Sequence, residues 1–220
     1  ALPELRLHDR VVRIASSLDL NQGTLFTVPA QTLGEQRMVR RGSIEARCKT
    51  IFEMARGEGR WLIWCELNDE QDSLEKLFGD LAFSVQGSDS PEKKTASIHS
   101  WISGERPVMI SKGSIMGFGL NFQHCSNMIF AGLTHSYEQF YQSVRRCWRF
   151  GQTAPVDVYL VQTDADGAIA QNLKRKAADA DEMAAEMIGL VKDHQLQSVR
   201  GMRPGSAPDA NRSVSLPSWM

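Results

Sequence analysis

The sequence has no long hydrophobic run and no marked excess of either charge. No apolar stretch approaches the roughly 20 residues that a membrane-spanning helix requires. The first residues also lack the basic and then apolar order of a signal peptide. We therefore expect a cytoplasmic protein with no membrane partner. Because the formal net charge is −1, attraction to phosphate must come from local basic patches and not from the chain as a whole.

Cysteine is scarce and shows no pairing pattern. The four cysteines, Cys48, Cys65, Cys125 and Cys147, include no Cys-x-x-Cys arrangement. His124 directly precedes Cys125, but no second pair of ligands stands at the spacing that zinc requires. We expect reduced, mostly buried thiols and no metal site.

Two patterns of nucleotide-hydrolysing domains are also absent. A phosphate-binding loop needs Gly-x-x-x-x-Gly-Lys-Ser/Thr, and the nearest string, Gly87 to Thr95, lacks the second glycine. No Asp-Glu pair follows a predicted strand, because Asp69 and Glu70 lie at a predicted helix start. These 220 residues therefore lack the parts that hold ATP and Mg²⁺ in such domains.

Short apolar runs alternate with amphipathic segments through most of the chain. The runs predict strands at 61–65, 82–85, 108–110, 128–130 and 156–161, and the amphipathic segments predict helices at 43–56, 69–78, 91–103 and 167–191. Strand and helix in alternation, with short connections, predict an α/β fold with a parallel sheet covered by helices on both faces. In such sheets ligands bind beyond the carboxyl ends of the strands.

The composition divides the chain into three parts. Residues 1–43 alternate apolar patches with charge in a nearly extended spacing, and we interpret them as a linker or hinge from a preceding domain. Residues 44–195 hold the strand and helix pattern. Residues 196–220 are rich in Gly, Pro, Ser and Asn, which predicts a flexible C-terminal tail. Because the chain starts without methionine and enters patterned sequence at once, we expect a piece of a longer protein.

The segment from Gln142 to Gln152 is the most informative. On a helix, Gln142, Arg146 and Arg149 share one face at i, i+4 and i+7. Guanidinium groups are planar, permanently charged and able to bind phosphate oxygens in pairs. A fixed group of arginines is therefore a phosphate clamp, and a solvated basic helix face is the alternative.

A glycine-rich segment, 111–122, comes one strand earlier. Its Gly117 and Gly119 allow close approach of the backbone to an anionic ligand, and a structural turn is the alternative.

The Gln-x-x-x-Arg-x-x-Arg-x-Gly-Gln pattern resembles motif VI of superfamily-two helicases and translocases, especially the Swi/Snf-like branch. The Gly-x-Gly-Leu-Asn-Phe string of 117–122 resembles motif V, most closely in phage and prophage members. The resemblance implies a RecA-like, P-loop NTPase-like helicase domain 2 without its own P-loop, the C-terminal half of an ATP-dependent helicase. Arg145 departs from the family, which often has an acidic residue there.

The resemblance also implies roles for individual residues. By this resemblance the arginine fingers on ATP are Arg146 and Arg149. Further ATP-binding residues would be Gly117, Gly119, Asn121 and Gln142. The resemblance also implies that the nucleic acid is contacted by Gln86, Gly87, Ser88, Ser111, Lys112 and Ser114. ATP and Mg²⁺ would be held mainly by an N-terminal RecA-like domain of the same protein, and the nucleic acid would be double-stranded DNA.

Two further hypotheses stand beside the helicase. The chain could be a stand-alone, non-catalytic nucleic-acid-binding or regulatory module with a helicase-like fold. It could also be an unrelated α/β enzyme that acts on a small phosphorylated substrate. On the helicase hypothesis, the chain by itself hydrolyses essentially no ATP.

Overall fold

The computed structural model describes residues 2–12, 41–117, 119–132 and 136–163, together with helical positions 171, 175, 176, 178, 179 and 183. The chain divides into two units, 1–176 and 177–220, and the sheet described below belongs to the first. The predicted flexible tail and most of the predicted helix 167–191 lie outside the described residues. No described helix has both the length and the apolar character that would let it cross a membrane.

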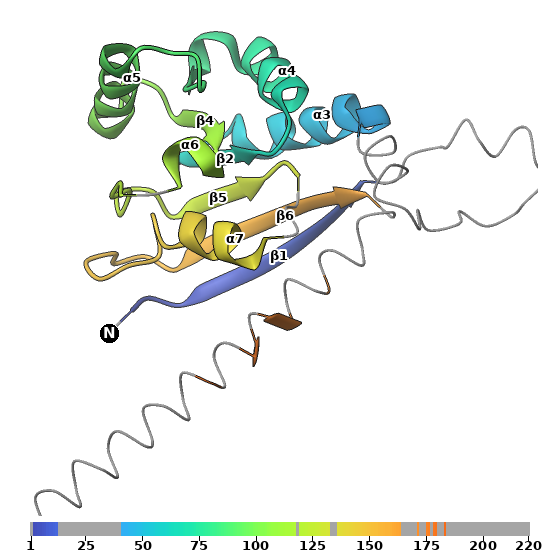
Figure 1. Cartoon of the computed structure of the whole chain (residues 1–220), viewed down its shortest axis with the longest axis vertical. Helices are drawn as coiled ribbons and strands as arrows, with labels where there is room; N and C mark the ends of the chain where they lie inside the picture. The colour runs from blue at the N-terminus through green and yellow to red at the C-terminus, as the bar shows by residue number, and fades with distance from the viewer. Residues whose placement is uncertain are drawn as a thin grey trace, which may run out of the picture. The chain divides into compact units, whose positions relative to one another are not determined.

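The described part of the first unit is built on a parallel sheet of six strands (Figure 1). The strands are β1 (Leu5–Val12), β2 (Trp61–Cys65), β3 (Ala82–Ser84), β4 (Val108–Lys112), β5 (Asn127–Phe130) and β6 (Val156–Thr163). Their order across the sheet is β1-β6-β5-β2-β4-β3, and every neighbouring pair is parallel. The predicted α/β class and its parallel sheet are confirmed.

Helices connect the strands. They are α3 (Ile44–Ala55), α4 (Asn68–Phe78), the 3₁₀ turn η1 (Gly79–Leu81), α5 (Pro91–Ser103), α6 (Gly113–Met116) and α7 (Tyr137–Val144). Local sequence explains the ends of α5. The Ser90 hydroxyl accepts a hydrogen bond from the Lys93 amide at 3.3 Å, Pro91 occupies the first turn, and Gly104 ends the helix at φ +93°.

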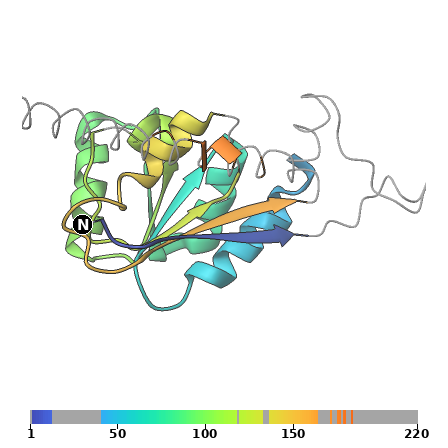
Figure 2. The same ribbon diagram turned by 90° about the horizontal axis from the view of Figure 1, so that it is seen from below.

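The sheet has one hydrophobic core on each face. Along β2, Leu62 and Trp64 point into a core covered by α5, α6 and α7, whereas Trp61, Ile63 and Cys65 point into a core covered by α3 and α4. Figure 2 shows α7 and α3 on opposite sides of the sheet. This burial on both faces explains why the central strands are continuous apolar runs. All four cysteines are free and buried, as the sequence predicts.

The first strand differs from the interpretation of residues 1–43 as a linker. Leu5–Val12 pairs with β6 along its whole length, from Leu5 opposite Val156 to Val12 opposite Thr163. This segment is therefore an edge strand of the sheet. The sequence signal is weak because an edge strand is only partly covered: the exposed fractions of Leu7 and Val11 are 37% and 53%.

The arginine segment also differs from the prediction of one continuous helix. Helix α7 ends at Val144, and the chain continues in turns, with the amides of Arg146 and Cys147 bonded to carbonyls three residues earlier. The carbonyl of Arg146 instead accepts from the Phe122 amide at 2.9 Å. This tertiary contact, together with Gly151 at φ +94°, replaces the helical pattern that the spacing suggested.

Candidate functional site

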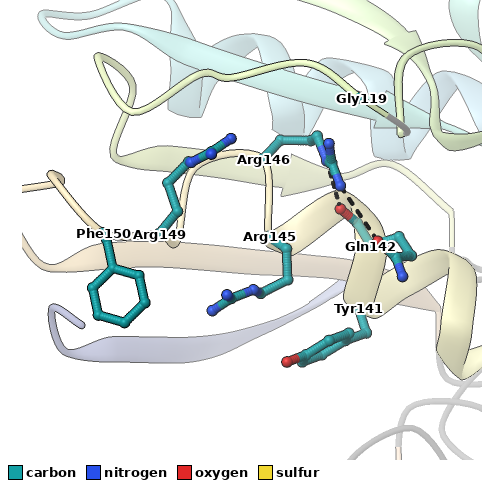
Figure 3. Close-up of a pocket in the computed structure, with 7 residues that line it drawn as sticks. All are labelled: Gly119, Tyr141, Gln142, Arg145, Arg146, Arg149 and Phe150. Atoms are coloured by element: carbon teal, nitrogen blue, oxygen red, sulfur yellow. Dashed lines mark hydrogen bonds between the residues drawn. The ribbon is translucent and has the colours of Figure 1, made fainter. Parts of the chain in front are cut away.

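A pocket of about 530 Å³ lies where the end of α7 meets the loop after α6 (Figure 3). It is lined by Gly119, Tyr141, Gln142, Arg145, Arg146, Arg149 and Phe150. Three of these residues are arginines and none is acidic. The pocket is thus suited to an anion, and the turns after α7, rather than a helix face, bring the arginines together.

Arg146 is held in position by neutral acceptors. Its Nε donates to the Gln142 carbonyl at 3.0 Å, its Nη2 to Gln142 Oε1 at 3.3 Å, and its Nη1 to the Leu120 carbonyl at 3.1 Å. Figure 3 shows the two bonds to Gln142. None of these partners carries a negative charge, so the guanidinium is oriented and its charge is left uncompensated.

The two neighbouring arginines add to this charge. Burial, followed by the positive charges of Arg149 and Arg145, lowers the pKa of Arg146. The guanidinium carbon of Arg145 lies 5.3 Å from the centre of the Trp148 ring. Among the described residues, the Arg149 guanidinium has no hydrogen-bond or ion-pair partner. A bound anion would relieve the mutual repulsion of these cations.

The two glycines of the Gly-x-Gly segment have different roles. Gly119 lines the pocket, at φ +77° in open space. Gly117 instead packs inside: a Cβ there would lie 2.1 Å from the Gly113 carbonyl oxygen and 3.2 Å from Ser143 Oγ. Gly117 therefore permits the close contact between α6 and α7.

Of the other two predicted ATP-binding residues, one lines the pocket and one does not. Gln142 lines the pocket and orients Arg146. Asn121 lies outside the lining, and its side-chain oxygen accepts from the Gln123 amide at 3.2 Å.

The predicted nucleic-acid contacts gather at the carboxyl ends of β3 and β4. A Cβ added to Gly87 would lie 3.8 Å from the Ile115 side chain, so the two loops are neighbours. Gly87, Ser88 and Ser114 are exposed, Gln86 and Lys112 are half-buried, and the ammonium of Lys112 donates to the Asn68 side chain.

Ser111 does not share this surface. It is fully buried, and its hydroxyl donates to the Val85 carbonyl at 2.9 Å. Its side chain serves to join β4 to the loop after β3.

One lysine and two helix ends add positive charge around these loops. The amino ends of α4 and α5 lie directly after the loops that follow β2 and β3. The ammonium of Lys94 donates to the Gly87 carbonyl at 2.9 Å, and Lys93 pairs with Asp89 at 2.6 Å. Free amides and the helix dipole at such ends favour phosphate oxygens.

A buried ion pair between Arg47 and Glu70 was not predicted from the sequence. Arg47 Nη2 lies 2.7 Å from Glu70 Oε1, and the two side chains are 1% and 0% exposed. Arg47 Nε also donates to Ser43 Oγ at 2.8 Å, and its Nη1 to the Ala131 carbonyl. The Ser43 hydroxyl makes no hydrogen bond to the amides of α3, so its side chain does not cap that helix.

Backbone amides hold the second oxygen of the carboxylate in this pair. Glu70 Oε2 accepts from the amides of Glu66 and Leu67, both at 3.0 Å. The network thus joins α3, the start of α4 and the end of β5. The one sequence signal was the four-residue spacing from Arg47 to the buried Ile51, which places the arginine on the inner face of α3. No group of three potential metal ligands occurs in the described part of the chain.

Comparison with known proteins gives one family match, over just under half of the chain. Residues 43–151 match the model of the helicase conserved C-terminal domain. The fold is similar to that of the C-terminal part of the Fun30 ATPase domain, with a TM-score of 0.59 and 13% sequence identity, covering 79% of this chain and 90% of that one. The fold is thus RecA-like. None of the curated protein sequences matches the chain.

Proposed function

We propose, from the premise that residues 43–151 form a helicase C-terminal domain, that the chain is the C-terminal half of an ATP-dependent DNA helicase or translocase. It would belong to superfamily two, in the Swi/Snf-like branch of phage or prophage type. In this proposal Arg146 and Arg149 are arginine fingers for ATP bound to an N-terminal RecA-like domain.

The observation that carries the proposal is the way in which Arg146 is fixed. All three of its hydrogen-bond partners are neutral, and the pocket contains no carboxylate that would neutralise it. A structural arginine normally pairs with an acid, whereas a pre-oriented, uncompensated cation is suited to charge that develops on a reacting phosphoryl group.

The lining residues fit a polyphosphate but not a metal. ATP with Mg²⁺ supplies a phosphoryl group whose oxygens share negative charge as it is transferred. Arg146, held by Gln142, would meet that charge in a fixed direction, Arg149 would reach it from the open side, and Gly119 lets the backbone approach. Because the lining has no carboxylate, the ligands of Mg²⁺ must come from the partner domain.

The loops at the ends of β3 and β4 would contact the backbone of double-stranded DNA. Gln86, Gly87, Ser88, Lys112 and Ser114 offer amides, hydroxyls and one ammonium, which hold phosphates without reading bases. The nearby amino ends of α4 and α5 favour the same charge. Closure of the two RecA-like domains on ATP would then move this surface along the duplex.

The test is ATP hydrolysis by the protein that includes the N-terminal domain, with Arg149→Ala compared with wild type. We expect the DNA-stimulated rate to fall on the order of 10³-fold or more, as for loss of an arginine finger, with DNA binding retained. Arg56→Ala is the control, because Arg56 lies on the surface in a pair with Glu53. A variant as fast as wild type would favour the non-catalytic binding module instead.

The proposal also predicts that the 220-residue chain alone hydrolyses essentially no ATP, because it contains no phosphate-binding loop. A radiolabelled hydrolysis assay on the purified chain measures this directly. Turnover that co-purifies with the chain, and that Arg146→Ala abolishes, would contradict the need for a second domain.

A further inference from the structure

The arginine pocket has two unlike sides. Figure 3 shows Arg146, Arg149 and Gly119 along one side and Tyr141, Arg145 and Phe150 along the other. The first side presents guanidinium groups and open backbone. The second presents two aromatic rings with a third guanidinium between them. A simple anion would use only the first side.

The aromatic rings of the second side are exposed and do not belong to either hydrophobic core. The exposed fractions of Phe150 and Tyr141 are 69% and 39%, whereas Phe140, on the same helix as Tyr141, is buried. Tyr141 is ordered by stacking on Tyr137, with ring centres 5.9 Å apart. Exposed rings held in place beside a charged pocket offer surface for a flat ligand.

Arg145 completes this surface. Its guanidinium lies over the Trp148 ring at 5.3 Å, and the Trp148 indole is fixed by a hydrogen bond from Nε1 to the Pro3 carbonyl at 2.8 Å. Guanidinium planes and aromatic faces are the surfaces on which nucleic-acid bases stack. The second side of the pocket is therefore chemically suited to a heterocyclic base.

We propose that this pocket binds the purine base of the same nucleotide whose phosphates lie against Arg146 and Arg149, with Tyr141, Arg145 and Phe150 as the stacking surface. This rests on the proposed function, since it concerns the same site. The volume of about 530 Å³ lies within the roughly 300–1,000 Å³ of small-molecule pockets. Stacking area, rather than base-edge hydrogen bonds, would set the preference, so ATP and GTP bind alike and CTP and UTP more weakly.

The experiment compares ATP with inorganic tripolyphosphate, which has the phosphate chain but no base. The purified 220-residue chain is titrated with each, and binding is followed by NMR at the Gly119 amide and the Trp148 indole. We expect ATP to bind several-fold more tightly. Phe150→Leu and Tyr141→Leu should each reduce ATP affinity by about fivefold, since a stacked base contributes about 1–3 kcal/mol. Both should leave tripolyphosphate affinity unchanged.

Two controls separate stacking from folding. Tyr141→Phe keeps the ring and should bind ATP like wild type. Leu77→Ala removes an apolar side chain on α4 whose exposure is similar to that of Tyr141, and it should change neither affinity.

The proposal is overturned if the chain does not bind ATP, if ATP and tripolyphosphate bind equally, or if the leucine variants weaken both ligands alike. Its failure is separable from failure of the proposed function. An Arg149-dependent ATPase with no effect of the rings on the ATP-to-tripolyphosphate ratio would refute only the base site. An ATPase indifferent to Arg149 would refute the arginine fingers.

Discussion

Two arginines of this chain, Arg47 and Arg146, are held in opposite ways. Arg47 is 1% exposed and is paired with the Glu70 carboxylate at 2.7 Å, with Ser43 and the Ala131 carbonyl as further acceptors. Arg146 is fixed as firmly, but each of its acceptors is neutral and its charged neighbours are Arg145 and Arg149. A guanidinium group therefore stabilises the fold where it has a counter-charge, and it is available to bind a ligand where it has none.

The energetic consequences differ accordingly. A buried ion pair recovers its cost of desolvation only while both partners remain, so the loss of one partner is severe. A partly exposed arginine keeps some contact with water, and repulsion from like charges is its main cost. The comparison predicts a large stability effect at the first site and a ligand effect at the second.

The largest effect is expected for Glu70→Gln, which leaves Arg47 buried without a counter-charge. The free energy of unfolding should fall by about 3–5 kcal/mol, measured by urea denaturation. Glu53→Gln, at the exposed pair with Arg56, should cost less than about 1 kcal/mol. Equal costs for the two variants would mean that Glu70 does not compensate Arg47, and the comparison would fail.

A smaller change in stability is expected for Arg146→Ala. Lost hydrogen bonds and relieved repulsion oppose each other, so the free energy of unfolding should change by no more than about 1 kcal/mol. The effect should fall on the ligand. Tripolyphosphate at tenfold its Kd should stabilise wild type by about 1.4 kcal/mol and the variant much less, in thermal unfolding. A loss of stability as large as that of Glu70→Gln would make the pocket a structural element.

The smallest change in stability is expected from the titration of His124, whose imidazole, unlike a guanidinium, can lose its proton. Burial, and then the positive charge of Arg60, lowers the pKa of His124. Its ring packs against Trp101 with centres 4.7 Å apart. The pKa of His124 is lower in the folded state than in the unfolded state. The stability that depends on the neutral imidazole is therefore present above about pH 6.5 and is lost as the pH falls through the folded value.

The free energy of unfolding should therefore decrease as the pH falls below about 6.5. His124→Phe should flatten part of this slope in urea titrations at each pH. His99→Gln, at an exposed position of α5, is the matched control. If His124→Phe leaves the slope as steep as in wild type, the imidazole is not held neutral by its surroundings.

The central strands and their helices were predictable because their signals are local. The runs at 61–65 and 108–110 are buried on both faces, and the ends of α5 follow from Ser90, Pro91 and Gly104. Of the candidate site, the meeting of Gly119 with Gln142, Arg146 and Arg149 was predicted.

What sequence reasoning missed depends on contacts between distant residues. The strand β1 pairs with β6 about 150 residues later, and Arg47 meets Glu70 across two helices. The end of α7 at Val144 depends on the bond from the Phe122 amide to the Arg146 carbonyl. The burial of Ser111 likewise follows from the loop after β3. Periodicity along the chain carries no information on such partners.

The pairing of β1 with β6 has a consequence for synthesis. During translation at about 5–20 residues per second, β1 is made roughly 8–30 s before its partner, since the strands are about 150 residues apart. Until then β1 is an unpaired strand, and β6, once formed, has a free edge wherever residues 5–12 are removed. Such edges recruit strands from other chains. Versions of the protein that begin after Val12 should therefore aggregate on expression.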